Sequence, residues 1–380
     1  MLQTSLIMIS SGEYKTMEKV SFKEFTKLIA DNALKSDTPS VGSFELTPLC
    51  NLDCKMCYVH LQDPSVKEKM LGKDQWIPMI QDAIDDGMFV ALLTGGEALM
   101  HPDFWDIYMY LIDRGVSVQV KTNGILLNEE NIQRFTEYPP FRIDISLYGC
   151  DSESYVAVTG VDAFERVTGN IRAAIDAGLN IRLMITPSSF LAPWIEQTMK
   201  VARSFGISVV VNGILDEPNP NTGRHREDFE LSSEEYNRIM AMKEEIFLPD
   251  YDLEDEVEFN LNDRPDVAEK GLHCGGGRIM FALNWDGMMV PCLSFPRTVI
   301  CVNALEKGFR QAWNEVNQAI KNYEVPKKCH SCEYNTRCHY CPVVHQKTAD
   351  QHLCDEALCA WTIERIEMLD KRQNTENQGE

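Results

Sequence analysis

Six short apolar runs rich in β-branched residues alternate with helical patterns along residues 42–214, and this alternation most constrains the fold. The runs read GSFELTP, FVALLTGG, VSVQVKTNG, FRIDISLYG, NIRLMITP and ISVVVNGI. The five gaps between them have helical periodicity, and several of the predicted helices end in Gly just before the next run. Strands that alternate with helices form a parallel sheet with right-handed crossovers. The sequence therefore predicts an α/β fold, although periodicity alone does not distinguish a closed barrel from an open sheet.

Polar and glycine-containing motifs follow the predicted strands at the points where the strands end. These motifs read LC, TGGE, KTNG, SLYGC and NGI. In both closed barrels and open parallel sheets, ligands bind at the carboxyl ends of the strands. We therefore expect the functional site at this edge of the sheet.

The composition is that of a globular protein with one large domain and one smaller domain. The chain has 380 residues, of which 44% are hydrophobic, so it can bury a substantial core. Neither a signal-peptide pattern nor an apolar run near the roughly 18 residues of a membrane span is recognisable. We therefore expect a cytoplasmic protein without a membrane partner. In that setting its 13 cysteines indicate metal ligands rather than disulfides.

The charge and the change in pattern along the chain suggest a division into four segments. A formal net charge of -22 argues against a nucleic-acid partner, because phosphate binding needs a basic surface. We expect a lead-in helix within 1–40, the α/β core at 41–215, a polar connector at 216–272 and a cysteine-rich domain at 273–380. The last domain is expected to have little regular structure beyond a hairpin that turns at Asp286-Gly287.

The stretch LTPLCNLDCKMCYVHL places Cys50, Cys54 and Cys57 directly after the first predicted strand. Three thiolates can hold three irons of a [4Fe-4S] cluster and leave the fourth iron open to a small molecule. Three cysteines and a water can also form a zinc site, but zinc ribbons use paired C-x2-C knuckles, whereas the first gap here is three residues.

The C-x3-C-x2-C motif, followed by an aromatic residue, resembles the signature of the radical S-adenosylmethionine (radical SAM) enzymes. The resemblance implies a partial (β/α)6 TIM-like barrel and a [4Fe-4S] cluster on Cys50, Cys54 and Cys57. It also implies that S-adenosylmethionine chelates the fourth iron. In that family, reductive cleavage of this cosubstrate releases a 5′-deoxyadenosyl radical, which abstracts a hydrogen from the substrate.

The resemblance extends to the ends of the later strands, where it implies contacts with S-adenosylmethionine. It assigns the methionyl amine to the LTGGE motif, the methionine and ribose to polar positions in KTNG and ISLYG, and the adenine to the aromatic residue after the cysteines. The residues concerned are Gly95, Gly96, Glu97, Asn123, Ser146 and Tyr58. Taken one at a time, Gly95-Gly96, Asn123 and Ser146 are also typical of ordinary turns.

The C-terminal cysteines have two interpretations. The run CHSCEYNTRCHYC contains paired C-x2-C knuckles, which are typical of a zinc-ribbon binding or scaffold protein. Behind a radical SAM barrel, however, seven cysteines at these gaps resemble the SPASM extension, which holds two auxiliary [4Fe-4S] clusters. The resemblance assigns Cys274, Cys292 and Cys341 to the first cluster and Cys329, Cys332, Cys338 and Cys359 to the second. Cys354 is an alternative to Cys359, and Cys301, Cys354 or the substrate could complete the first cluster.

SPASM enzymes mostly modify peptides or proteins, and DISLYGCDSESYVAVTG resembles a region common in peptide maturases. The resemblance therefore implies a ribosomally made peptide or protein substrate, crosslink formation or a related oxidation, and an electron donor such as flavodoxin or ferredoxin. Many such maturases carry an N-terminal leader-binding module of roughly 80 residues, and the 40-residue lead-in is too short for one. We therefore expect either that a separate protein binds the leader or that the substrate is recognised otherwise. Leu293 follows Cys292 where sulfatase maturases carry an Asp, which disfavours that reaction. A radical SAM dehydrogenase acting on a small molecule is the alternative.

Cys150 lies just past the fourth predicted strand, outside both groups of cluster cysteines. At that edge of the sheet its thiol could return a hydrogen atom to a substrate radical, as epimerases require. The alternative is an inert small residue in a βα loop, since most cysteines outside clusters are structural.

Overall fold

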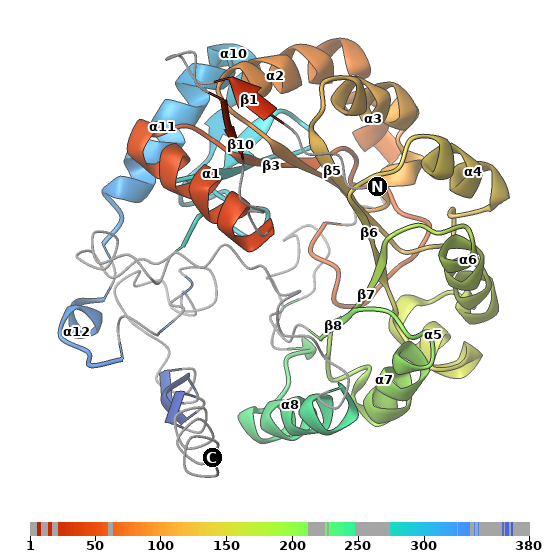
Figure 1. Cartoon of the computed structure of the whole chain (residues 1–380). Coiled ribbons are helices and arrows are strands. Elements are labelled where there is room, and N and C mark those ends of the chain that lie inside the picture. Colours follow the sequence, from red (N-terminus) through yellow and green to blue (C-terminus); the bar gives the residue numbers. More distant parts are fainter. Residues whose placement is uncertain are drawn as a thin grey trace.

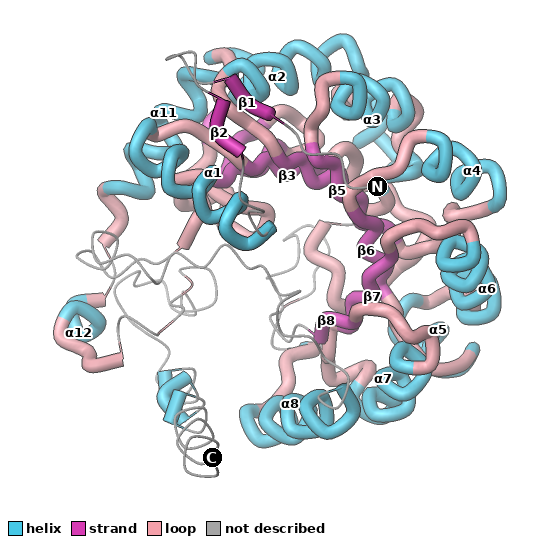
Figure 2. Tube along the Cα trace, in the orientation of Figure 1, coloured by secondary structure: helices cyan, strands magenta, loops and turns pink. Residues whose placement is uncertain are grey.

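A nine-stranded sheet forms the centre of the fold (Figure 1). The computed structural model describes residues 6–8, 14–16, 22–59, 64–211, 225, 228–247, 274–324, 326–334, 338, 341, 359–360, 362–364 and 366–367. The strand order is β11-β10-β9-β3-β4-β5-β6-β7-β8, with β11 and β8 at the two edges. The sheet is therefore open and curved, consistent with a partial barrel (Figure 2).

The six predicted strands are all present, pair in chain order and run parallel. They are β3 (Val41–Glu45), β4 (Val90–Thr94), β5 (Ser117–Thr122), β6 (Arg142–Ser146), β7 (Ile181–Ile185) and β8 (Val209–Val211). Because neighbouring strands are consecutive in the sequence and parallel, all their carboxyl ends meet at one edge of the sheet. The predicted α/β fold is confirmed.

The five predicted helices are also present, and they cover the convex face of the sheet (Figure 1). They are α2 (Lys73–Asp85), α3 (Phe104–Asp113), α4 (Glu129–Glu137), α6 (Phe164–Asp176) and α7 (Ile195–Arg203). Strand residues alternate between the two faces, so Leu93, Val120 and Ile145 are fully buried under these helices. A further helix, α5 (Ser152–Thr159), precedes α6 and begins at the N-cap Asp151, whose side chain accepts a hydrogen bond from the Ser154 amide.

Residues after Cys274 extend the same sheet rather than standing apart from it. Strand β9 (Met280–Leu283) pairs parallel with β3, and β10 (Met288–Val290) and β11 (Val302–Asn303) add antiparallel strands. The predicted hairpin turn is confirmed, and Gly287 adopts a φ of 80° there. Near the start of the chain, β1 (Leu6–Met8) pairs with β2 (Tyr14–Thr16), followed by the expected helix α1 (Phe22–Ser36).

Helices occur in the predicted connector and in the C-terminal segment, and the expectation of little regular structure in the C-terminal segment was wrong. Helix α8 (Ser233–Phe247) lies in the predicted connector and packs on α7, with Ile239 fully buried. The C-terminal part contains α10 (Ala304–Lys307), α11 (Phe309–Lys321) and α12 (Lys327–His330). The domain boundaries themselves stay predictions. None of the helices in the described ranges is long and apolar enough to cross a bilayer.

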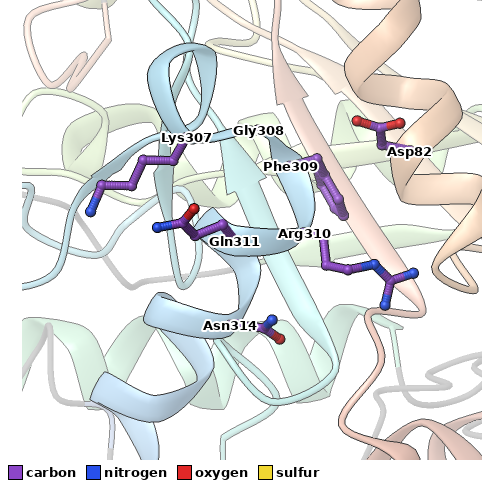
Figure 3. Close-up of a pocket in the computed structure, with 7 residues that line it drawn as sticks. All are labelled: Asp82, Lys307, Gly308, Phe309, Arg310, Gln311 and Asn314. Carbon is purple, nitrogen blue, oxygen red and sulfur yellow. The ribbon is translucent and has the colours of Figure 1, made fainter.

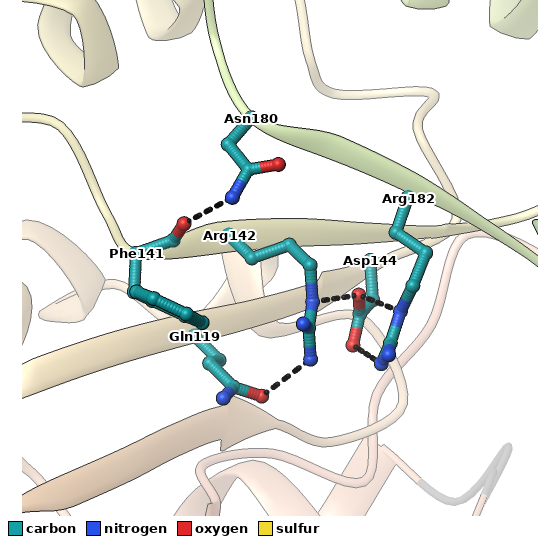
Figure 4. Close-up of polar contacts among 6 residues, drawn as sticks. All are labelled: Gln119, Phe141, Arg142, Asp144, Asn180 and Arg182. Atoms are coloured by element: carbon teal, nitrogen blue, oxygen red, sulfur yellow. Dashed lines mark hydrogen bonds and ion pairs between the residues drawn. The ribbon is translucent and has the colours of Figure 1, made fainter. Parts of the chain in front are cut away.

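An ion-pair network joins three neighbouring strands on the face of the sheet opposite the helices (Figure 4). Asp144 of β6 accepts hydrogen bonds from Arg182 of β7 at 2.9 and 2.8 Å, and one from Arg142 Nε at 2.9 Å. Arg142 also donates to Gln119 of β5 at 3.2 Å. The side chain of Asp144 is 1% exposed and those of the two arginines are 19% and 18% exposed. The network therefore ties β5, β6 and β7 together from within the curved sheet.

Candidate active site

The three N-terminal cysteines lie on a loop that follows β3 at the carboxyl edge of the sheet. Cys54 is buried, and Cys50 and Cys57 are half-buried. The loop is held by backbone hydrogen bonds from Asp53 to Thr159 at 2.9 Å and from Lys55 to Val158 at 3.1 Å, both at the end of α5. The sequence thus places three cysteines, none in a disulfide, on a well-anchored loop where ligands of parallel sheets bind.

The thiols of this loop are close enough to influence one another's protonation. Burial raises the pKa of Cys50 to about 12 and that of Cys54 well above its usual range, with the neighbouring thiols adding to both shifts. Metal binding requires deprotonated thiols, so cluster assembly here must release protons. Among the residues that the structure describes, no three His, Cys, Asp or Glu side chains converge as ligands of a single metal ion.

The TGGE motif packs directly beneath the cysteine loop. The Gly96 amide donates to the Thr47 carbonyl at 2.6 Å, and the Glu97 amide donates to the Leu49 carbonyl at 2.9 Å. Gly95 has a φ of 149°, and a Cβ on it would overlap the carbonyl oxygen of Thr47. A Cβ on Gly96 would likewise overlap the carbonyl of Leu49. The two glycines thus allow a close approach of two backbones, while their predicted contact with the methionyl amine stays a prediction.

Glu97 is buried and connects the ends of β4 and β5. Its carboxylate accepts hydrogen bonds from the Leu99 amide at 3.2 Å, the Thr122 hydroxyl at 2.9 Å and the Asn123 amide at 2.8 Å. Burial raises the pKa of this carboxyl to about 7, and the three hydrogen bonds oppose that rise. The side chain fixes the strand ends that surround the cysteine loop, and its predicted contact with S-adenosylmethionine stays a prediction.

Asn123 and Ser146, the two polar residues predicted at the next strand ends, both lie beside the cysteine loop. The Asn123 amide group donates to the sulfur of Cys50 at 3.5 Å and to Asn51 at 2.7 Å. Burial raises the pKa of Tyr148 well above its usual range, and the neighbouring Ser146 opposes that rise. Tyr148 in turn opposes the rise in the pKa of the Cys54 thiol, so both residues lie near the loop. The structure therefore brings the motifs of β3, β4, β5 and β6 together.

Tyr148 was missed by the analysis of the sequence. The alternation of side chains along a strand is a signal that could have identified it. Residues two apart point to the same face, so Tyr148 lies on the same face as Ser146. Its ring packs edge-on against Tyr155 with centroids 6.3 Å apart.

Of the two remaining predicted residues near this edge, one lies on the cysteine loop and the other just before α5. Tyr58 is half-buried next to Cys57, and its position beside an adenine stays a prediction. Cys150 is half-buried before α5, and its sulfur lies 3.8 Å from the Ser154 hydroxyl, which also accepts from the Cys150 amide at 2.9 Å. Burial raises the pKa of the Cys150 thiol. A role as hydrogen donor stays a prediction.

The C-terminal cysteines flank the added strands and α12. Cys274 precedes β9, and its sulfur accepts from the Gly276 amide at 3.3 Å, while Cys292 lies just after β10. Cys329 belongs to α12, and the Cys332 amide donates to its carbonyl at 3.3 Å. The C-terminal cysteines in the described part are all half-buried, and they are Cys274, Cys292, Cys301, Cys329, Cys332, Cys338, Cys341 and Cys359. Cys354 lies outside the described residues, and the division into two clusters stays a prediction.

A surface pocket of about 440 Å³ lies away from this edge, between α2 and α11 (Figure 3). Asp82 lines one side and residues 307–311 and Asn314 line the other. Beside it, Arg310 forms an ion pair with Asp86. The lining contains none of the predicted site residues, so we attribute this pocket to the packing of two helices.

A family model described as the radical SAM superfamily matches residues 44–189, which include the cysteine loop and the ends of β4, β5 and β6. The chain contains a radical SAM domain. It is therefore an enzyme of the radical SAM type, and a [4Fe-4S] cluster and S-adenosylmethionine are its implied cofactors. The match favours the cluster over the zinc site for the N-terminal cysteines.

Known proteins with similar sequences and structures cover most of the chain. The AdoMet-dependent heme synthase of Methanosarcina barkeri is 26% identical over 354 residues, 86% of this chain and 97% of that protein. The antilisterial bacteriocin subtilosin biosynthesis protein AlbA of Bacillus subtilis is 22% identical over 280 residues, 73% of this chain and 60% of that protein. The solved structure of native anSMEcpe with bound AdoMet and Kp18Cys peptide has a TM-score of 0.69 at 15% identity, covering 90% of this chain and all of that one. This structural likeness establishes the shared fold.

The residues present fit the implied cofactors. Three thiols on one loop supply sulfur ligands of the kind that iron-sulfur clusters use. The backbone amides and side chains at the ends of β4, β5 and β6 surround that loop, so a cosubstrate bound there would meet polar groups from several strands. Cys50, Cys54 and Cys57 would hold the cluster.

Proposed function

We propose that this radical SAM enzyme abstracts a hydrogen atom from a ribosomally made peptide or protein and thereby forms a crosslink or a related oxidation product. The cluster and S-adenosylmethionine, when bound, supply the hydrogen-abstracting chemistry. The observation that carries the proposal is the convergence of the cysteine loop with the polar ends of β4, β5 and β6 at one edge of an open sheet. An open sheet leaves more room beside this edge than a closed barrel does, which suits a segment of polypeptide.

Two relatives support a peptide substrate. AlbA is named for the biosynthesis of a bacteriocin, and the anSMEcpe structure contains a bound peptide together with AdoMet. The position after Cys292 is occupied by Leu293 rather than an Asp, so we do not propose the oxidation that sulfatase maturases perform. An external electron donor, such as flavodoxin or ferredoxin, and a separate leader-binding protein belong to the same proposal.

We further propose that the C-terminal cysteines form a SPASM domain with two auxiliary [4Fe-4S] clusters. Cys274, Cys292 and Cys341 would hold the first cluster and Cys329, Cys332, Cys338 and Cys359 the second. All seven are only half-buried and none forms a disulfide, and Cys274 and Cys292 lie at the two ends of the added hairpin sequence. Metal bonds of this kind stabilise segments that have a small core of their own.

A small-molecule substrate is the second candidate, because the heme synthase relative aligns over nearly its whole length. Both candidates use the same site at the carboxyl edge. They differ in what must fit beside the cysteine loop: an extended polypeptide in one case and a compact molecule, such as a heme precursor, in the other.

Isotope transfer separates the two candidates. The reconstituted and reduced enzyme would be incubated anaerobically with S-adenosylmethionine and either a deuterated candidate peptide, encoded by a neighbouring gene, or a deuterated heme precursor. We expect deuterium in 5′-deoxyadenosine with the peptide, and the loss of that deuterium and of one further hydrogen from the peptide. A matched Cys54→Ala variant should give neither product. Deuterium transfer from the heme precursor alone would replace the peptide proposal with the small-molecule one.

A further inference from the structure

Cationic side chains gather on the concave face of the sheet, which is the face opposite the helices (Figure 4). Arg142 of β6 and Arg182 of β7 both contact Asp144, whose side chain is 1% exposed. Lys121 of β5 pairs in register with Asp144 and is exposed. Positive side chains are therefore concentrated at this face, in a chain whose formal net charge is -22.

Arg182 is held in one orientation by Asp144. Its Nε donates to Oδ1 at 2.9 Å and its Nη2 donates to Oδ2 at 2.8 Å, so the pair is bidentate. The two residues are also paired in register across β6 and β7, which fixes their backbones. A guanidinium is planar and has five N–H donors. The bonds to Asp144 occupy only its Nε–Nη2 edge.

The other edge of the Arg182 guanidinium is available to a ligand. Among the described residues, the side-chain hydrogen bonds of Arg182 all go to Asp144, so the Nη1–Nη2 edge keeps two parallel N–H groups. The side chain is 18% exposed and therefore reaches solvent. Asp144 lies two residues before Ser146, so this position is only about 7 Å from the strand end beside the cysteine loop.

We propose that Arg182 binds a carboxylate of the substrate through its Nη1–Nη2 edge and that Asp144 is the positioning residue that orients this fork. A guanidinium edge matches a carboxylate with two parallel, charge-assisted hydrogen bonds. Partial burial strengthens such a pair relative to one in water. The inference rests on the proposed function and deepens it, because it names an anionic group on the substrate: an acidic residue of a peptide or a carboxyl group of a small molecule.

Binding of matched probes to the reconstituted full-length enzyme tests the inference. The probes are the pentapeptide Ac-Gly-Gly-Glu-Gly-Gly-NH2, the same peptide with Gln in place of Glu, and glutarate. Isothermal titration calorimetry at low ionic strength gives their dissociation constants. We expect the wild type to bind a carboxylate probe about tenfold more tightly than the Gln peptide. Tighter binding of the Glu peptide than of glutarate supports a peptide carboxylate, and the reverse supports a compact acid. Equal affinities for all three probes would overturn the inference.

Arg182→Lys separates the fork from its charge. Lysine keeps a positive charge beside Asp144 but replaces the planar fork with a single ammonium group. We expect the preference for the carboxylate probe to fall about fivefold to tenfold. Arg134→Lys is the matched control, because Arg134 also pairs with a carboxylate, that of Glu130, but on helix α4 of the convex face. This control should keep the wild-type preference.

Two results with these variants would contradict the inference. One is an unchanged preference in Arg182→Lys, or an equal loss in both variants. The other is a loss of affinity in Arg182→Lys for S-adenosylmethionine alone, because the fork would then bind the carboxylate of the cosubstrate.

Photocrosslinking to the wild type tests the same site if Arg182→Lys fails to fold. The Glu peptide, with benzoylphenylalanine next to its Glu, is irradiated on the enzyme, and the crosslinked residues are mapped by mass spectrometry. Crosslinks to β5, β6 or β7 that excess unlabelled Glu peptide suppresses support the inference, and crosslinks only elsewhere overturn it. Failure of the proposed function is distinct: neither deuterated substrate would then transfer deuterium to 5′-deoxyadenosine, whether or not the carboxylate probes bind.

Discussion

At the scale of single residues, Gly95 and Gly96 are required by the backbone beside them. Both lie against carbonyl groups of the cysteine loop, where a Cβ has no room. Glu97 also has a structural role, because its carboxylate accepts three hydrogen bonds from residues at the ends of β4 and β5. Gly95, Gly96 and Glu97, which the resemblance assigns to the cosubstrate, therefore also support the backbone of the cysteine loop. Substituting them affects both the packing of the loop and the predicted binding of the cosubstrate.

Gly95→Ala should destabilise the protein. The substitution places a Cβ against the Thr47 carbonyl and strains a backbone with a φ of 149°. We expect the free energy of unfolding of the cluster-free protein to fall by about 1–3 kcal/mol in anaerobic denaturant titrations. Gly169→Ala is the control: it lies in α6 with open space around it and should gain about 0.5–1 kcal/mol. Wild-type stability of Gly95→Ala would refute this account of the motif.

Glu45 at the end of β3 should make stability depend on pH. Burial raises the pKa of its carboxyl to about 7, Asp286 adds to the rise, and Asn284 and Arg297 oppose it. The folded state thus binds the proton more tightly than the unfolded state. Stability is greatest below about pH 4.5 and falls as the pH rises to about 7, by about 3 kcal/mol for this group.

The Glu45→Gln variant removes this dependence and should gain stability relative to the wild type across that pH window. Denaturant titrations of the cluster-free protein at several pH values measure the difference. The control Glu129→Gln removes an exposed carboxylate on α4. It shows how much the pH dependence of stability changes when any single carboxylate is lost. A wild-type pH profile in Glu45→Gln would contradict the assignment.

At the scale of elements, the strands and helices of the core follow from their periodicity, whereas α5, α8 and α11 were missed. Helix α5 has the sequence SESYVAVT, which is short and rich in β-branched residues, so it has little helical signal of its own. Its N-cap Asp151 and its packing under the cysteine loop stabilise it instead. Helix α11 has a regular apolar pattern, with Phe309, Trp313 and Val316 buried, and was overlooked beside the cysteine motifs.

Pairings far apart in the sequence were beyond prediction. No periodic pattern in the sequence indicates that β9 lies beside β3. The pairing of distant strands depends on side-chain packing, such as that of Phe44 and Phe281, whose ring centroids lie 5.7 Å apart in an edge-on arrangement. The same holds for the site: the motifs indicated an edge of the sheet, but only the structure shows the Asn123 amide group 3.5 Å from the Cys50 sulfur.

The Asp144 network should stabilise the sheet between β5 and β7. Asp144→Asn leaves Arg142 and Arg182 near each other without the carboxylate that joins them. We expect a loss of about 3 kcal/mol in the free energy of unfolding, because breaking a buried ion pair from one side leaves a charge uncompensated. Lys200→Ala removes the exposed pair with Glu196 on α7 and should leave stability near the wild-type value. Equal effects of the two variants would count against the network.

At the scale of the whole molecule, the C-terminal hairpin is continuous with the radical SAM sheet. Strand β9 pairs with β3, the strand that leads into the cysteine loop, and β10 leads directly to Cys292. A cluster on Cys274 and Cys292 would therefore lie on the same sheet as the N-terminal cluster. The proposed auxiliary clusters would bind segments to this sheet through metal bonds as well as through packing.

Metal analysis of anaerobically prepared protein tests this account most directly. Three cubane clusters predict about 12 iron and 12 sulfide per chain in the wild type. The Cys54→Ala variant should retain about two-thirds of both, because the auxiliary clusters would assemble independently, and should form no 5′-deoxyadenosine. Protein that contains zinc without iron or sulfide, or a Cys54→Ala variant that still cleaves S-adenosylmethionine, would contradict the account.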